Sequence, residues 1–135
     1  MLKAKTKVHV IPHTHWDREW YFTTSRSKIY LAKQVKEVLE TLENNEEFKY
    51  YLLDAQASLL DDYLKWYPED KGRLEALIAA KRIMTGPWYT QTDQLVISGE
   101  SIVRNLYYGQ SIAESFGHSM AVGYVPDAFG QAAQM

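Results

Sequence analysis

The residues best suited to chemistry stand together near the N-terminus, in the segment His-Thr-His-Trp-Asp at positions 13–17. Histidine and aspartate side chains are both good ligands for a divalent cation such as Zn²⁺. In an extended chain, residues i and i+2 point to the same side, so His15 and Asp17 could share one ion. The alternative interpretation is a loop whose polar side chains only satisfy neighbouring backbone groups. The dense polar and aromatic surroundings, which include Arg18 and Trp20, favour the metal site.

A second candidate, Asp127, lies in the segment Val-Pro-Asp-Ala-Phe-Gly at 125–130. The proline restricts the backbone just before this aspartate, and a Phe-Gly turn follows it. Such a setting suits a carboxylate that must keep a fixed geometry. The alternative is an Asx-turn, in which the aspartate side chain accepts hydrogen bonds from the amides that follow.

Two weaker candidates each have a structural and a functional interpretation, and a third has a structural one alone. The turn Gly-Pro-Trp-Tyr at 86–89 presents Trp88 either to the core or to a bound sugar. Glu100 and Arg104 form an i,i+4 pair that supports a helix by a few tenths of a kcal/mol. Arg104 could instead position an active-site carboxylate through a bidentate contact. The acidic pair at 61–62 is interpreted as an exposed helix face.

Hydrophobic periodicity indicates which elements would position these residues. Strands are predicted at 7–11, 48–53, 83–84 and 121–125. Helices are predicted from a cap at 25 or 27 to residue 44, at 58–66, from 68 to about 81, and from a cap at 98 to residue 117. The order β-α-β-α-α-β-α-β predicts a parallel sheet covered by helices. The polar clusters follow strand ends, with Asp54 after the second strand, and parallel α/β folds bind ligands at these ends.

Composition narrows the function classes. The 135 residues carry a net charge of -2, which gives no nucleic-acid footprint, and contain no cysteine, which excludes thiolate metal sites and disulfides. No apolar run approaches the roughly 20 residues that span a bilayer, and the N-terminus does not read as a signal peptide, so we expect a cytoplasmic protein without membrane contact. Ten tyrosines and four tryptophans suit either core packing or a carbohydrate platform. A small sheet would expose an edge, so we expect residues 1–135 to be part of a larger domain.

Five segments together resemble glycoside hydrolase family 38, the α-mannosidases, and in particular its bacterial branch. They are VIPHTHWDREWY (10–21), LLDAQ (52–56), GPWY (86–89), SGESIVRNLYYG (98–109) and GYVPDAFGQAAQM (123–135). The resemblance implies a metal-dependent retaining α-mannosidase with a parallel-sheet, (β/α) barrel-like domain of the glycoside hydrolase and deacetylase type. Residues 1–135 would form the N-terminal portion of that catalytic domain and would be inactive alone.

The resemblance also implies roles for residues of this chain. A divalent ion would be held by His15, Asp17 and Asp127, and Asp127 would also be the catalytic nucleophile. Trp20 would lie against the bound mannose, and Arg104 would neighbour the nucleophile. The fourth metal ligand and the general acid/base would lie after residue 135.

The chain departs from the family pattern at two places. Gln131 stands where many relatives have histidine, at a position that is not a metal ligand. Ala55 stands where many relatives have glycine, which leaves the role of Asp54 open.

The sequence therefore predicts an enzyme that removes terminal α-linked mannose from oligosaccharides by double displacement. Zn²⁺ is the preferred cofactor, with Co²⁺, Mn²⁺ or Ca²⁺ as alternatives. Substrate contacts are predicted for Trp20, Trp88, Arg104 and Asp54, and a homo-oligomer is left open. Two rival functions remain: a non-catalytic metal- or carbohydrate-binding fragment, and another metal-dependent hydrolase such as a deacetylase.

Overall fold

The computed structural model describes residues 5–134, and at their centre lies a two-stranded parallel sheet. Strand β1 (Tyr51–Leu52) pairs with β2 (Ile83–Met84), so that Leu52 lies beside Met84. Isolated parallel bridges lengthen the paired region, one between His13 and Leu52 and one between Gln56 and Trp88. The predicted α/β class with parallel strands is confirmed, and the (β/α) barrel-like arrangement stays a prediction.

Helices make up most of the remaining regular structure. They are α1 (Thr24–Asn44), α2 (Ser58–Leu64), the 3-10 helix η1 (Pro68–Asp70), α3 (Lys71–Ala79) and α4 (Gly99–Ser115). The hydroxyl of Thr23 caps α1, in place of the predicted cap at 25 or 27. Ser98 caps α4 as predicted, since its Oγ accepts a hydrogen bond from the Ser101 amide at 3.1 Å. None of these helices is long and apolar enough to cross a bilayer.

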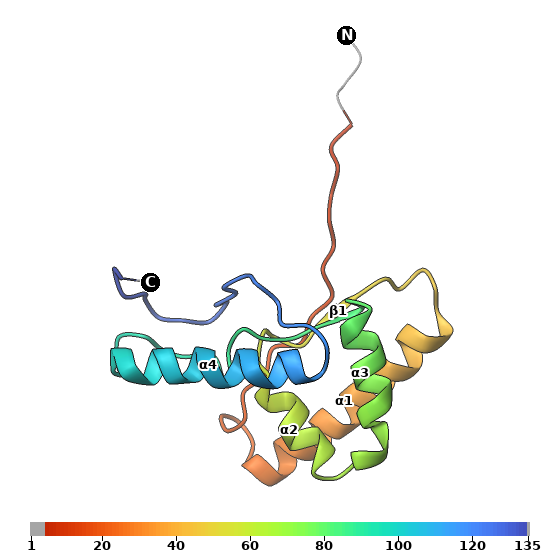
Figure 1. Ribbon diagram of the computed structural model, residues 1–135, viewed down its shortest axis with the longest axis horizontal. Coiled ribbons are helices and arrows are strands. Elements are labelled where there is room, and N and C mark those ends of the chain that lie inside the picture. Colours follow the sequence, from red (N-terminus) through yellow and green to blue (C-terminus); the bar gives the residue numbers. More distant parts are fainter. Residues whose placement is uncertain (1–4, 135) are drawn as a thin grey trace.

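The helices divide into two groups on either side of the strands (Figure 1). Helices α1, α2 and α3 share one apolar core with β1 and β2, which includes Leu39, Leu60 and Leu74. Helix α4 packs on the other side through Ile102, which joins a second core around Trp88. The sheet is thus a thin layer between two helical layers, and the loops at the strand ends lie where the layers meet.

Close packing of α4 fixes the segment that follows β2. A Cβ atom on Gly109 would lie 2.2 Å from the carbonyl carbon of Trp88, so only glycine allows this approach. One turn earlier on α4, Asn105 Oδ1 accepts hydrogen bonds from the amides of Tyr89 (2.7 Å) and Thr90 (3.0 Å). The loop that leaves the sheet after Trp88 is therefore anchored to a helix.

Two predicted strands are wrong. Residues 7–11 are exposed and extend away from the body of the molecule, and pairing begins only at 12–14, where Leu52 N donates to Pro12 O (Figure 1). Residues 121–125 form no strand, although Met120 N donates to the carbonyl of Thr85, just after β2. Both segments have strand-like composition, but neither finds a continuous backbone partner among residues 5–134, and a strand requires one.

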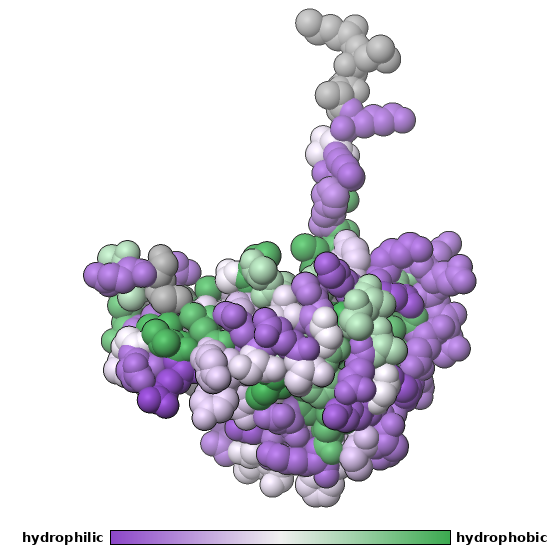
Figure 2. Space-filling model, in the orientation of Figure 1, coloured by the Kyte–Doolittle hydropathy of each residue, from purple (hydrophilic) through white to green (hydrophobic). Residues whose placement is uncertain are grey.

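The surface follows the same division as the cores. Figure 2 shows a mostly hydrophilic face over the half that contains α1 and α3, with hydrophobic side chains more frequent toward α4 and the C-terminal segment. Exposed large apolar residues there include Leu95, Val122 and Phe129. The C-terminal segment lies against the loop before α4, because Ala132 N donates to Gln94 Oε1 at 2.9 Å.

Candidate functional site

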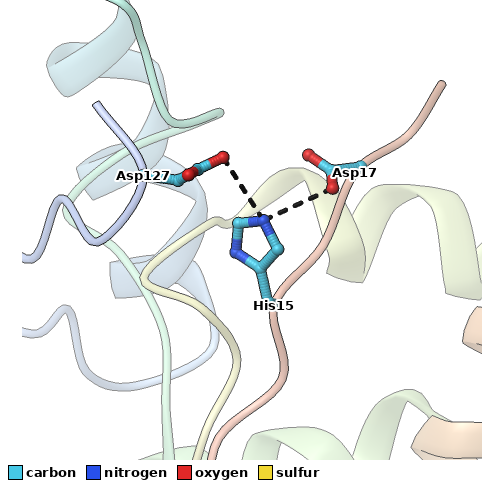
Figure 3. A group of neighbouring side chains, drawn as sticks. All are labelled: His15, Asp17 and Asp127. Carbon is cyan, nitrogen blue, oxygen red and sulfur yellow. Dashed lines mark ion pairs between the residues drawn. The ribbon is translucent and has the colours of Figure 1, made fainter. Parts of the chain in front are cut away.

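His15, Asp17 and Asp127 meet at one point, although more than a hundred residues separate the last from the first two. Nε2 of His15 lies 3.3 Å from an oxygen of Asp17 and 3.6 Å from an oxygen of Asp127. One potential ligand atom from each residue lies within 4.8 Å of the other two. Figure 3 shows the two carboxylates on the same side of the imidazole, one from the N-terminal segment and one from the C-terminal segment. This convergence is what the two sequence motifs predicted.

Backbone pairing accounts for the position of the first motif. Thr14 N donates to Leu52 O, so that His15 leaves the sheet beside the end of β1. Thr14 itself is buried, and its hydroxyl accepts a hydrogen bond from Gln34 on α1. The side chains of His15 and Asp17 then project on the exposed side, where they are about half accessible.

Asp54 lies directly beneath this cluster and is completely buried. Its Oδ2 lies 3.6 Å from Nδ1 of His15, the ring nitrogen opposite the one that faces Asp17 and Asp127. The same oxygen accepts hydrogen bonds from the Trp16 amide and from Gln56 Nε2, both at 2.9 Å. Burial raises the pKa of the Asp54 carboxyl, and these hydrogen bonds offset part of that effect.

The cluster carries negative charge without a basic partner. Asp17, Asp54 and Asp127 form ion pairs only with His15 within residues 5–134. Arg18 stands close by, but its guanidinium is bound to both carboxylate oxygens of Asp62, and this hydrogen bonding raises the pKa of Arg18. Three carboxylates around one imidazole create a site that a cation would neutralise.

Two hollows flank His15 and Asp17. One is a cleft of about 270 Å³ that is also lined by Asp127, Gln91 and Asp93. The other, of about 280 Å³, is lined on its far side by the aromatic rings of Trp20, Tyr21, Phe22 and Tyr30. The cluster therefore stands between a polar cleft and an aromatic one, and both open to solvent.

The donor set fits the divalent cation that the family resemblance implies. One imidazole nitrogen and carboxylate oxygens form the mixed nitrogen and oxygen ligation that suits Zn²⁺. Side chains that already converge within 4.8 Å need only small movements to close on one ion. The fourth place in a tetrahedral site would be filled by another residue, by water or by substrate.

Comparison with known proteins agrees with this geometry. Residues 5–135 match the family model for the N-terminal domain of the family 38 glycosyl hydrolases. The chain belongs to glycoside hydrolase family 38. The predicted resemblance is confirmed by this match, which extends over both motifs.

Several relatives are similar over almost the whole chain. A protein of Halalkalibacterium halodurans named "Putative mannosylglycerate hydrolase" is 38% identical over 127 residues, which cover 93% of this chain and 14% of that protein. Alpha-mannosidase G of Dictyostelium discoideum is 29% identical and is matched over 98% of this chain and 12% of its own length. The crystal structure of an alpha-mannosidase from Enterococcus faecalis V583 superimposes with a TM-score of 0.89 at 39% identity, over 92% of this chain and 14% of that one. The chain thus spans about a seventh of the length of the first of these relatives and of the solved structure.

The structure leaves Trp20 and Asp127 accessible, as their predicted roles in a family 38 enzyme require. Trp20 is 73% exposed and forms part of the aromatic hollow beside His15. The side chain of Asp127 is 57% exposed and faces the polar cleft. Contact of either residue with a substrate stays a prediction.

Three residues that were predicted to contact substrate have other contacts in the structure. Trp88 is only 1% exposed, and its indole Nε1 donates to the carbonyl of Tyr124, so it packs in the second core rather than forming a sugar-stacking wall. Asp54 is inaccessible beneath His15. Arg104 is paired with Glu100 at 2.7 Å on the exposed face of α4, as helix support, and has no ion pair with Asp127.

The acidic pair at 61–62 was also predicted wrongly. Asp62 is 1% exposed and is neutralised by Arg18, Lys28 and Lys65. The arginine and Lys28 come from positions 44 and 34 residues earlier, so no local pattern reveals the network. Asp61 is half-buried and accepts a hydrogen bond from the Tyr89 hydroxyl.

Sequence reasoning missed the polar wall at 90–93. Gln91 N donates to Gln56 Oε1 at 3.1 Å, and Gln91 Nε2 donates to the carbonyl of Asp54 at 2.7 Å. These bonds tie the wall of the cleft to the loop beneath His15. The only hint in the sequence is the run of polar residues after the Gly-Pro-Trp-Tyr turn.

Proposed function

We propose that this chain contributes the nucleophile and three cation ligands to a metal-dependent retaining α-mannosidase. The observation that carries the proposal is the convergence of Asp17 and Asp127 on Nε2 of His15, with no lysine or arginine paired to either carboxylate among the described residues. In an ion-pair network that only stabilises a fold, carboxylates are paired with basic side chains. Asp17 and Asp127 have no lysine or arginine partner among the described residues.

Retaining glycosidases use two carboxyl groups about 5–5.5 Å apart, one as nucleophile and one as acid and then base. Asp127 is the accessible carboxylate at the cleft and would attack the anomeric carbon. His15 and Asp17 would hold the cation together with Asp127. A bound divalent cation would bind sugar hydroxyls and help to hold the ring in the distorted shape that approaches the oxocarbenium-like state. The acid/base lies after residue 135 if the family pattern holds.

The two hollows suggest how the substrate would be held. The exposed ring of Trp20 offers an apolar surface for the C–H face of a sugar, beside the ligands. On the other side, Thr90, Gln91 and Asp93 line the polar cleft that contains Asp127, and these side chains can form hydrogen bonds with sugar hydroxyls.

A terminal α-linked mannosyl group is the proposed substrate class. The relatives are named alpha-mannosidase and mannosylglycerate hydrolase. Both names refer to a mannosyl group, and they differ in the leaving group to which the mannosyl group is attached. Assays of the full-length protein with an aryl α-mannoside, an α-mannose oligosaccharide and mannosylglycerate would define the group that leaves.

The test is turnover of the aryl α-mannoside by the full-length protein. Asp127→Ala should lower kcat by at least about a thousandfold, because it removes the nucleophile. A chelator should abolish turnover and added Zn²⁺ or Co²⁺ should restore it. Asp70→Asn is the control, since Asp70 pairs with Tyr63 and Arg73 outside the site and its loss should leave kcat unchanged. Substantial turnover by Asp127→Ala, or turnover that a chelator does not affect, would reject the proposal.

Product stereochemistry tests the retaining step separately. Proton NMR of the released sugar in the first minutes should show the α-anomer, because two displacements restore the original configuration. Release of the β-anomer would exclude Asp127 as a covalent nucleophile.

A further inference from the structure

We infer that Asp54 is a positioning residue for the cation site. Its carboxylate would take the proton-bearing Nδ1 of His15 and thereby leave Nε2 free to bind the cation. This inference rests on the proposed function, since it concerns how one proposed ligand is prepared. It differs from the direct substrate contact that the sequence suggested for Asp54.

The two nitrogens of His15 face opposite groups. Nε2 faces Asp17 and Asp127, whereas Nδ1 faces Oδ2 of Asp54 at 3.6 Å. A neutral imidazole carries its proton on only one nitrogen, and a carboxylate beside that nitrogen determines which. With the proton held toward Asp54, the lone pair of Nε2 points at the two ligand carboxylates. A distance of 3.6 Å is slightly longer than a hydrogen bond, so a small rotation of the ring completes the contact.

Asp54 is held more firmly than the ligands above it. The Trp16 amide and Gln56 Nε2 both donate to the oxygen that faces His15, and the backbone carbonyl of Asp54 accepts from Gln91. All three donors are neutral, and the two that reach the carboxylate orient it without neutralising it. The charge of Asp54 is therefore directed at the imidazole.

The backbone at this position is strained in a way that a packing role does not require. Asp54 has φ +44° and Ala55 has φ +56°, both in the left-handed region that favours glycine. Such residues cost on the order of 1–3 kcal/mol each and persist where the surroundings over-determine them. Two in succession turn the chain sharply after β1 and place the Asp54 carboxylate under His15.

Full burial excludes a direct role in substrate binding, because no part of the Asp54 residue reaches solvent. An acidic residue that served packing alone would be replaced by an apolar side chain of similar volume at little cost in stability. The geometry instead matches the carboxylate–histidine–metal arrangement, in which an outer carboxylate orients a ligand histidine.

The experiment measures cation affinity of the full-length protein by competition with a chromophoric chelator, using Zn²⁺ and Co²⁺ as probes. Asp54→Asn keeps the shape of the side chain and removes its charge. We expect this variant to bind either ion about 10–100-fold more weakly, with a changed visible spectrum of bound Co²⁺. Asp70→Asn is the matched control, because it makes the same change at a buried carboxylate far from the cluster, and its affinity and spectrum should equal those of the wild type.

The outcomes separate this inference from the proposed function. Wild-type affinity and spectrum in a folded Asp54→Asn variant would overturn the positioning role and leave the cation site intact. Wild-type protein that binds neither ion would overturn both proposals. If Asp54→Asn does not melt cooperatively, Gln56→Met takes its place, because it removes one donor to Oδ2 and leaves the His15 contact. A weakening of about twofold to tenfold is expected for that variant, and unchanged affinity would overturn the inference.

Discussion

Two sets of carboxylates in this molecule have opposite surroundings. In the helical half, Asp62 is neutralised by Arg18, Lys28 and Lys65, and Asp70 by Arg73. Beside the end of β1, Asp17, Asp54 and Asp127 meet around a single imidazole and have no lysine or arginine partner among residues 5–134. The first set is paired with basic side chains of the described chain. The second would be neutralised by the cation that we propose.

The two regions also differ in how they are built. The helical half rests on a continuous apolar core between α1, α2 and α3, and its ion pairs lie at the margin of that core. The site is made of loops that leave the sheet, held by backbone and amide hydrogen bonds rather than by apolar contact. A change in one region should therefore affect stability, and a change in the other should affect binding.

The largest expected effect comes from breaking the helical half. Leu39 on α1 is fully buried in the first core, so Leu39→Ala should lower the free energy of unfolding by about 2–5 kcal/mol. Chemical denaturation followed by circular dichroism measures this value. Trp20→Ala is the matched control from the site region and should change stability by no more than about 0.5 kcal/mol, because its ring is exposed. Equal losses would show that the two regions do not differ as described.

Removal of a proposed ligand, His15, should impair cation binding in the other region. His15→Ala should weaken binding of Zn²⁺ more than about a hundredfold. Loss of a residue that contacts a metal ligand, but not the metal itself, usually weakens binding by less. The thermal melting temperature of the metal-free protein should change little, because the His15 side chain is half-exposed. Calorimetric titration measures the affinity. Binding within tenfold of the wild type would place the cation elsewhere.

The pH dependence of stability should reveal the pairing of Asp70 in the helical half. Burial acts to raise the pKa of Asp70, but hydrogen bonds from Tyr63 and Arg73 prevail and hold it below its usual value. A carboxyl with a lowered folded-state pKa stabilises the fold fully above its unfolded pKa of about 4, and this contribution is lost as pH falls through the folded value. Asp70→Asn should therefore cost about 1–3 kcal/mol at pH 7 and progressively less below about pH 4. A difference that does not change with pH would contradict this account.

The smallest expected effect sharpens the charge comparison. Ala128 lines the polar cleft next to Asp127, the proposed nucleophile, so Ala128→Lys would place a basic side chain beside the cluster. Affinity for Zn²⁺ should fall about tenfold at low salt and recover partly at high salt, because exposed charges are screened. Ala128→Gln is the neutral control. Equal affinities of the two variants at low salt would show that the charge of the cluster does not govern cation binding.

The elements near the site were predictable where local patterns decide them. Helical spacing and a serine cap located α4, and β2 begins at Ile83, where a strand was predicted to begin. Strands at 7–11 and 121–125 were predicted from composition, but a strand exists only with a partner, and the sequence does not show the partner. The convergence of His15 with Asp127 was predicted by placing both after strands of one parallel sheet, and it is observed although neither of those two strands forms.

The remaining errors concern burial and distant pairing. Asp62 and Asp54 are buried acids with partners from distant parts of the chain. The sequence predicted Asp62 on an exposed helix face and Asp54 in contact with substrate. For Trp88 the sequence left core packing and sugar contact open, and the structure places it in the core, where Gly109 lets α4 cover it. Ala55 adopts φ +56°, which explains why glycine suits this position in the family pattern.

The most direct test is a crystal structure of the full-length protein soaked with Zn²⁺, with anomalous differences measured at the zinc edge. The account predicts one strong peak about 2.0–2.2 Å from Nε2 of His15 and from oxygens of Asp17 and Asp127. It predicts that Asp17→Asn combined with Asp127→Asn removes that peak. A zinc ion held by other residues, or no peak between these three side chains, would contradict it.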